Sequence, residues 1–261
     1  MGIVLPIAIV GGLGIFFGVI LGISSGIFKV EKDEREEMVV ALLPGANCGG
    51  CGYAGCSALA AAIAKGEAPV SACPVMSEEA VRQIADVMGK KVSHIEKQVA
   101  FVICKGSDAN AWKKYEYTGI SDCFAAAKIG GGDKKCSYGC LGYGTCVGVC
   151  KFDAISVKNG VAVVDREKCT HCTMCIRICP KKVIASKPYK NDQAVTCATK
   201  EKGATLKEIC KVGCIGCKLC EKVCPTDAIH VIDNLAAIDY EKCINCGECA
   251  LKCPKKLISL K

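Results

Sequence analysis

The sequence predicts an α+β protein in which one N-terminal transmembrane helix precedes several small units rich in cysteine. The first 28 residues carry no charge, 24 of the 261 residues are cysteine, and aromatic residues make up only 5% of the chain. A chain with so few large apolar side chains cannot rely on one extensive core, and small units of this kind use inorganic groups instead. The cysteines are therefore the main guide to the fold.

The apolar segment 1–28 is long enough to cross a bilayer as one helix. A cleavable signal peptide is the alternative, but it would need basic residues before the apolar core, and there are none. The first basic residues follow the segment, so the positive-inside rule places the rest of the chain in the cytoplasm of a prokaryotic cell. Glycines at every fourth position favour packing against another membrane helix. They are Gly14, Gly18, Gly22 and Gly26.

One cysteine pattern occurs twice near the C-terminus. Each copy follows C-x2-C-x2-C-x3-C-P, in which three thiolates bind one [4Fe–4S] cluster and the fourth binds its neighbour. The pattern predicts that one cluster is bound by Cys214, Cys217, Cys220 and Cys253, and another by Cys243, Cys246, Cys249 and Cys224. Zinc is disfavoured because a zinc ribbon uses two cysteine pairs and needs neither the third cysteine nor the proline.

A related ferredoxin-like unit precedes this one. Cys150 and Cys169 are separated by 19 residues, as are Cys224 and Cys243, which indicates two copies of one fold. Hairpins are expected between these cysteines, over 154–164 with an Asn-Gly turn and over 228–238.

The first loop of the earlier copy is longer than usual and has Lys151 in place of proline, so its ligands are assigned by analogy only. One cluster then takes Cys136, Cys140, Cys146 and Cys179, and the other takes Cys150, Cys169, Cys172 and Cys175.

A separate glycine-rich segment precedes both units. Its glycines let the backbone wrap closely around a cofactor, and four cysteines predict one more [4Fe–4S] cluster. The expected ligands are Cys48, Cys51, Cys56 and Cys73. Helices are expected over 57–64 and 77–89, and a short strand over 99–104.

Four cysteines remain, and they occupy matched places before the two ferredoxin-like units. They are Cys104, Cys123, Cys197 and Cys210. They could bind a sixth cluster between the units, or they could be buried free thiols. The sequence therefore predicts five or six [4Fe–4S] clusters.

Several of these stretches resemble the B subunit of the Rnf complex. They are the N-terminal membrane helix, the glycine-rich run over 42–56, Cys-Ser-Tyr-Gly-Cys-Leu-Gly-Tyr-Gly-Thr-Cys over 136–146, and Cys-Lys-Val-Gly-Cys-Ile-Gly-Cys-Lys-Leu-Cys over 210–220. The resemblance covers the whole chain. It implies an iron–sulfur subunit of a membrane-bound, ion-translocating ferredoxin:NAD oxidoreductase, which takes electrons from soluble ferredoxin and passes them to the other subunits. We find no site for NAD or flavin in the sequence.

Two other classes of function share the cysteine patterns. One is an electron-feeding subunit of another enzyme, of the corrinoid-protein reductase or carbon monoxide dehydrogenase type, which the membrane helix argues against. The other is an iron–sulfur sensor, which would need an effector or nucleic-acid domain. No nucleic-acid partner is expected, since the basic residues alternate with acids and lack interleaved aromatics.

The charge of the protein is relevant to how it would dock with ferredoxin. The formal net charge of +8 counts every cysteine as neutral. Each cluster with four thiolates carries about −2, so five or six clusters bring the protein to roughly −2 to −4. Because ferredoxins are usually acidic, we expect docking on lysines beside a cluster loop. The candidates are Lys134, Lys135, Lys181 and Lys182.

These patterns divide the chain into five parts. They are a membrane anchor over 1–28, a juxtamembrane linker over 29–44, a cluster module over 45–95, a first ferredoxin-like unit with its leader over 96–187, and a second over 188–261.

Overall fold

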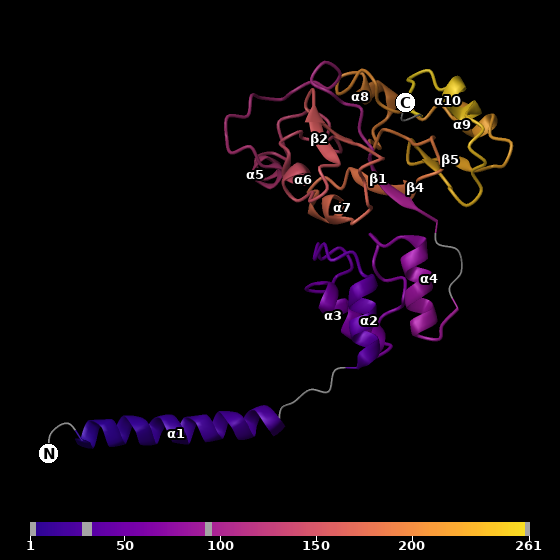
Figure 1. The fold of residues 1–261 in the computed structure, drawn as a ribbon. Helices are drawn as coiled ribbons and strands as arrows, with labels where there is room; N and C mark the ends of the chain where they lie inside the picture. The colour runs from indigo at the N-terminus through magenta and orange to yellow at the C-terminus, as the bar shows by residue number, and fades with distance from the viewer. Residues whose placement is uncertain (1–3, 28–32, 92–95, 259–261) are drawn as a thin grey trace.

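The computed structural model describes residues 4–27, 33–91 and 96–258 (Figure 1). Helix α1 covers Val4–Ile27, and its described side chains, from residue 9 to residue 24, are almost all exposed. None of the helices in the described ranges combines the length and the hydropathy that a membrane span requires. The membrane helix over 1–28 stays a prediction, and part of it lies outside the described residues.

A module of three helices follows α1. They are α2 (Glu34–Leu42), α3 (Cys56–Ala64) and α4 (Glu78–Val87). Helix α2 lies where the sequence indicated a solvated linker. Asp33 caps it by accepting a hydrogen bond of 2.9 Å from the amide of Arg35, and Val39 is fully buried in the module core. The predicted linker segment therefore contributes a helix to the module.

The first ferredoxin-like unit alternates short strands and short helices. Its elements are β1 (Gln98–Val102), α5 (Cys123–Lys128), α6 (Thr145–Gly148), β2 (Ile155–Lys158), β3 (Val161–Val164), α7 (Met174–Ile178) and β4 (Ile184–Pro188). Strands β2 and β3 form the expected hairpin, with Asn159 and Gly160 both in the left-handed region at its tip. Strand β4 pairs antiparallel with β1, a pairing that the sequence did not indicate.

The second unit repeats this arrangement with fewer strands. Its elements are α8 (Gly203–Leu206), α9 (Leu219–Lys222), β5 (Ile229–Ile232), β6 (Leu235–Ile238) and α10 (Glu248–Lys252). The hairpin of β5 and β6 matches that of β2 and β3. Where the first unit pairs Val102 with Ile184, the second has an isolated bridge between Val195 and Ile258. Each of these leader segments ends two residues before a cysteine, Cys104 or Cys197.

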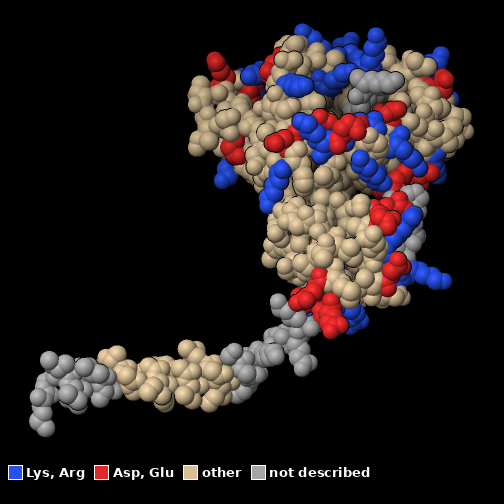
Figure 2. Space-filling view, in the orientation of Figure 1, with Lys and Arg blue, Asp and Glu red and all other residues tan. Residues whose placement is uncertain are grey.

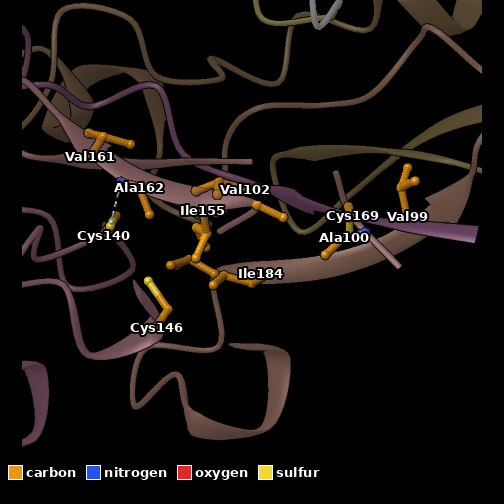
Figure 3. Packing of buried hydrophobic residues seen from close by; sticks show 12 residues of the cluster. Val99, Ala100, Val102, Cys140, Cys146, Ile155, Val161, Ala162, Cys169 and Ile184 are labelled. Atoms are coloured by element: carbon orange, nitrogen blue, oxygen red, sulfur yellow. Dashed lines mark hydrogen bonds between the residues drawn. The ribbon is translucent and has the colours of Figure 1, made fainter. Parts of the chain in front are cut away.

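Cysteines are part of the core in both units. In the first unit, Cys140, Cys146 and Cys169 are buried among aliphatic side chains such as Ile155 and Ile184 (Figure 3). In the second unit, Cys220 has the same role beside Ile229 and Ala236. The apolar core of each unit therefore surrounds its sulfur atoms.

A glycine lies under the hairpin tip in each unit. Gly142 has a φ of +83°, and a Cβ there would lie 2.4 Å from the backbone oxygen of Gly160. Gly216 has a φ of +66°, and a Cβ there would lie 3.2 Å from the backbone of Asn234. A side chain at either position would be strained, and the contact is closer in the first unit.

Candidate metal centres

All 24 cysteines are free thiols in the structure. Twelve of them line three cavities, four to each, and we sort the other twelve into three groups by their neighbours. Each group is named after one of its members or by its position. Within the described residues, no three side chains of histidine, cysteine, aspartate or glutamate converge on a point where a single metal ion could bind. A [4Fe–4S] cluster requires a different arrangement, because its four thiolate ligands surround a cavity that holds the iron and sulfide atoms of the cluster.

The second unit holds two groups, and each lines one cavity. The Cys217 group lines one cavity and consists of Cys214, Cys217, Cys220 and Cys253. The Cys246 group lines the other and consists of Cys224, Cys243, Cys246 and Cys249. These are the two crossed sets that the sequence pattern indicated.

The first unit holds a regular group, the Cys172 group. It consists of Cys150, Cys169, Cys172 and Cys175. Burial first, and then the sulfurs of Cys169, Cys172, Cys146 and Cys150, raise the pKa of Cys175 to about 12. The contribution of Cys146 shows that a second group lies next to this one.

That second group, the Cys123 group, differs from the one that the sequence suggested. Burial, and then the sulfurs of Cys140, Cys123 and Cys179, raise the pKa of Cys146 to about 12. Cys123 therefore lies where Cys136 was expected. Its backbone amide donates a hydrogen bond of 2.7 Å to the Thr145 side chain at the start of α6, which fixes Cys123 beside this loop.

One position of the loop explains why Cys123 replaces Cys136 in this group. In the second unit, Cys217 lies three residues after Cys214, and in the first unit Tyr143 lies three residues after Cys140. The loop therefore lacks one thiolate. Cys123, at the first residue of α5, supplies a sulfur from a segment that precedes the loop.

Cys136 belongs instead to a group between the two units, which we call the bridging group. Its members line one cavity. They are Cys104, Cys136, Cys197 and Cys210. Three of these four cysteines are those that the sequence suggested for a sixth cluster, and Cys136 takes the place of Cys123.

The bridging group follows the internal repeat. Cys136 and Cys140 have the same spacing as Cys210 and Cys214. The amide of Cys140 donates to the sulfur of Cys104 at 3.3 Å, and the amide of Cys214 donates to the sulfur of Cys197 at the same distance. Each unit therefore contributes two equivalent cysteines, one from its leader and one from the start of its loop.

The last group lies in the helical module, which packs against the first unit. Cys51, Cys56 and Cys73 pack against the core of the module, and Cys48 lies near Cys73, so these four are taken as the group that the sequence indicated. Burial raises the pKa of Cys73, and the sulfurs of Cys51 and Cys48 add to that rise. Asn47 holds the loop by accepting a hydrogen bond of 2.8 Å from the amide of Cys56.

Contacts between groups arrange five of the six into a series, and the sixth, the Cys246 group, shares the core of the second unit with the Cys217 group. The module reaches the Cys172 group, because a Cβ on Gly50 would lie 2.5 Å from the carbonyl oxygen of Cys172, and Arg177 donates to the carbonyl of Gly50. The Cys172 group neighbours the Cys123 group through Cys175 and Cys146. The bridging group then neighbours the Cys123 group on one side and the Cys217 group on the other.

The donor set fits clusters bound by thiolates. Backbone amides donate to many of these sulfurs, for example Ala100 to Cys169 at 3.4 Å and Ala228 to Cys224 at 3.1 Å. Such hydrogen bonds favour the thiolate form. Burial raises the pKa of Cys197 to about 12, so without positive iron the thiolate form would be disfavoured there. A group of four buried sulfurs supplied with amide donors is therefore suited to a charged metal cluster.

Not all lysines proposed for ferredoxin docking are available. Lys134 is only 2% exposed, which excludes it from any docking surface. Lys181 is partly buried and donates to the carbonyl of Gly131. Lys135 and Lys182 are exposed.

Two family models match parts of the chain. Residues 43–75 match a model described as a putative Fe–S cluster, and residues 168–228 and 213–257 match a 4Fe–4S dicluster domain. Together with the cavities that the cysteines line, these matches define the class of the protein, which is an iron–sulfur protein with 4Fe–4S domains.

Curated relatives narrow this class to one family. The chain is 44% identical to the B subunit of the ion-translocating oxidoreductase complex of Methanosarcina acetivorans, over 98% of this chain and 97% of the relative. It is 45% identical to the B subunit of the Na(+)-translocating ferredoxin:NAD(+) oxidoreductase complex of Acetobacterium woodii, over 98% of this chain and 78% of the relative. It is 40% identical to the proton-translocating counterpart of Clostridium ljungdahlii, over 93% of this chain and 87% of the relative. The chain belongs to the family of B subunits of ion-translocating ferredoxin:NAD oxidoreductase complexes, the Rnf complexes.

Proposed function

We propose that this chain accepts electrons from reduced ferredoxin and relays them, through six [4Fe–4S] clusters, to partner subunits of a membrane-bound, ion-translocating ferredoxin:NAD oxidoreductase. The observation that carries the proposal is the arrangement of the six cysteine groups, in which five follow one another through contacts and the sixth shares the core of the second unit. The clusters supply one-electron chemistry when bound. The residues of the chain bind the clusters, fix the spacing between them and exclude water, and no bond-making side chain is required.

The membrane anchor is part of this proposal. Ion translocation requires a membrane, and the uncharged segment 1–28 is the part of the chain suited to enter one. Basic residues directly after it favour a cytoplasmic location for the cysteine groups. We expect the glycine positions in α1 to pack against a helix of another subunit, since a Cβ on Gly14, Gly18 or Gly22 would meet no atom within 4 Å.

Ferredoxin is proposed to dock on the second unit. Of the 24 cysteines, only Cys217 and Cys246 are exposed. Exposed lysines lie along the same loops and helices, among them Lys218, Lys222 and Lys252. Figure 2 shows Lys and Arg side chains spread over both units on one face of the molecule. An acidic ferredoxin would be attracted to this end, and electrons would then travel towards the module that follows the anchor.

The test starts from anaerobically purified full-length protein. We expect about 24 irons per chain, four for each of six clusters. Reduced ferredoxin should bleach the visible absorption of the protein without any other subunit present. Membranes from cells that lack the chain should lose NADH-dependent ferredoxin reduction, and the full-length chain, but not a variant that starts at residue 33, should restore it. A protein that carries its clusters but takes no electrons from ferredoxin would contradict the proposal.

A further inference from the structure

Lys134 is a buried cation in the wall of the bridging cavity. Its side chain is 2% exposed, and it lines the cavity together with the four cysteines of the bridging group. Its ammonium donates to the carbonyl of Gly106 at 2.9 Å and to the carbonyl of Gly160 at 2.7 Å. The side chain therefore connects the leader of the first unit to the tip of its hairpin.

These contacts leave the charge of Lys134 without a counter-charge. Both partners are neutral carbonyl groups, and among the described residues no carboxylate lies within ion-pair distance of its ammonium. The neighbouring buried carboxylate, Asp133, pairs with Lys113 at 3.4 Å. A buried ammonium is costly unless an opposite charge offsets its lost hydration. The Asp108 carboxylate lies against Gly160 but does not line the cavity, so the negative charges in the cavity wall are the thiolates.

The electrostatic effect of Lys134 reaches two cysteine groups. Burial raises the pKa of Cys210 in the bridging group and of Cys140 in the Cys123 group. Lys134 opposes that rise in both cysteines. The repeat provides no equivalent in the second unit, because the residue two positions before Cys210 is the exposed Glu208. Lys255 of the second unit also opposes the rise at Cys210, but it is only partly buried, so the fully buried positive charge lies on one side of the bridging group.

We propose that Lys134 is the counter-ion of the cluster bound by the bridging group and raises its reduction potential. This inference rests on the proposed function. One-electron reduction of a cluster bound there would increase the negative charge of the site by one. A fixed ammonium stabilises the reduced form more than the oxidised form, because net charge close to a cluster is one determinant of its potential.

The alternative is that Lys134 only joins Gly106 to Gly160. Lys134→Met keeps an unbranched apolar stem one atom shorter and removes the charge, Lys134→Gln keeps hydrogen-bond donors without the charge, and Lys134→Arg keeps the charge. The readout is the midpoint potential of each cluster, measured by EPR during redox titration of the anaerobic full-length protein, together with iron content. Cys210→Ala, which removes a ligand of the bridging group, identifies its signal by difference.

Two other lysines serve as matched controls. Lys187 is 1% exposed but hydrogen-bonds to Asn191, away from the bridging cavity, so Lys187→Met tests the loss of a buried lysine alone. Lys105 lines the bridging cavity but is exposed to solvent, so water screens its charge. We expect neither Lys187→Met nor Lys105→Met to shift the signal of the bridging cluster as Lys134→Met does.

The expected result is a shift of one signal to lower potential in Lys134→Met and Lys134→Gln, with full iron content and a near-normal Lys134→Arg. A tenfold change in the ratio of reduced to oxidised cluster corresponds to about 59 mV for this one-electron couple. Full iron content with unchanged potentials in Lys134→Gln overturns the inference but leaves the relay intact. About 20 irons in the unaltered protein, with all four bridging thiols open to alkylation, overturns the bridging cluster and this inference together.

Discussion

In the second unit, three cysteines of one loop face the same cavity, whereas in the first unit Tyr143 stands at the middle position and Cys123 supplies the missing sulfur. Both units nevertheless keep the hairpin, the short helices and the spacing between their loops. The comparison shows that the scaffold preserves the position of the cavity, while the segment that supplies a sulfur can change. Four experiments test this view, beginning with the one for which we expect the largest effect.

Removal of one bridging cysteine should stop electron transfer from the clusters of the second unit to those of the first. Cys210→Ala leaves three sulfurs in the bridging group, and we expect the loss of about four irons. Clusters of the second unit should still be reduced by ferredoxin, while those of the first unit should stay oxidised on the time scale of turnover. EPR of the rapidly frozen protein measures this. Rapid reduction of the first unit in a protein short of four irons would show that the bridge is dispensable.

A pair of substitutions should make the first unit resemble the second. Cys123→Ser should remove or weaken the Cys123 group, because only Cys140, Cys146 and Cys179 remain. Adding Tyr143→Cys to this variant should restore the lost irons, since residue 143 corresponds to Cys217. Iron analysis and EPR of the single and double variants measure the rescue. If Cys123→Ser alone retains all irons, the assignment of Cys123 is wrong.

Reversing the charge of lysines in each unit should show which unit carries the docking surface for ferredoxin. Lys218→Glu with Lys222→Glu should weaken the apparent affinity for reduced ferredoxin by about tenfold at low salt, and less at high salt. Lys135→Glu with Lys182→Glu in the first unit is the matched control. We measure the rate of cluster reduction against ferredoxin concentration. A larger effect from the control pair would move the docking surface to the first unit.

The two glycines beneath the hairpins should differ in their tolerance of a side chain. Gly142→Ala combines a left-handed backbone with a contact of 2.4 Å to Gly160, and should lower the free energy of unfolding by about 3 kcal/mol. Gly216→Ala has the strained backbone but a looser contact, and should cost about 1 kcal/mol. Anaerobic urea unfolding of both holoproteins gives the comparison. Equal losses of unfolding free energy in the two variants would mean that the hairpin of the first unit can shift away from the new side chain at little cost.

Much of the fold could be predicted because short sequence patterns determine it locally. The Asn159-Gly160 turn indicated a hairpin that the structure contains, and the cysteine runs of the second unit line the two expected cavities. The pairing of β1 with β4 could not be predicted in this way, because it joins segments more than 80 residues apart in the sequence. Helix α2 was missed since charged residues dominate its first turn and its apolar residues form one continuous run, 38–42, without helical periodicity.

The sequence assigned Cys123 and Cys136 to each other's groups for a similar reason. Sequence spacing treats cysteines in order along the chain, whereas the cavities take sulfurs from segments that meet only after folding. One signal could have corrected the assignment, namely the equal spacing of Cys136 to Cys140 and of Cys210 to Cys214. The burial of Lys134 had no comparable signal. A lysine beside another lysine is usually solvated, and only the closure of the leader over the hairpin removes this one from water.

The division of the bridging group between the two units has a consequence for biosynthesis. Cys104 and Cys136 are made well before Cys197 and Cys210, so the emerging first unit presents a half-built cavity with two sulfurs. Domains fold in order from the N-terminus during synthesis. The bridging cluster can therefore be inserted only after Cys210 has been translated. Of the six groups, the bridging group is the one that takes sulfurs from both units, so its assembly also depends on the docking of the second unit on the first.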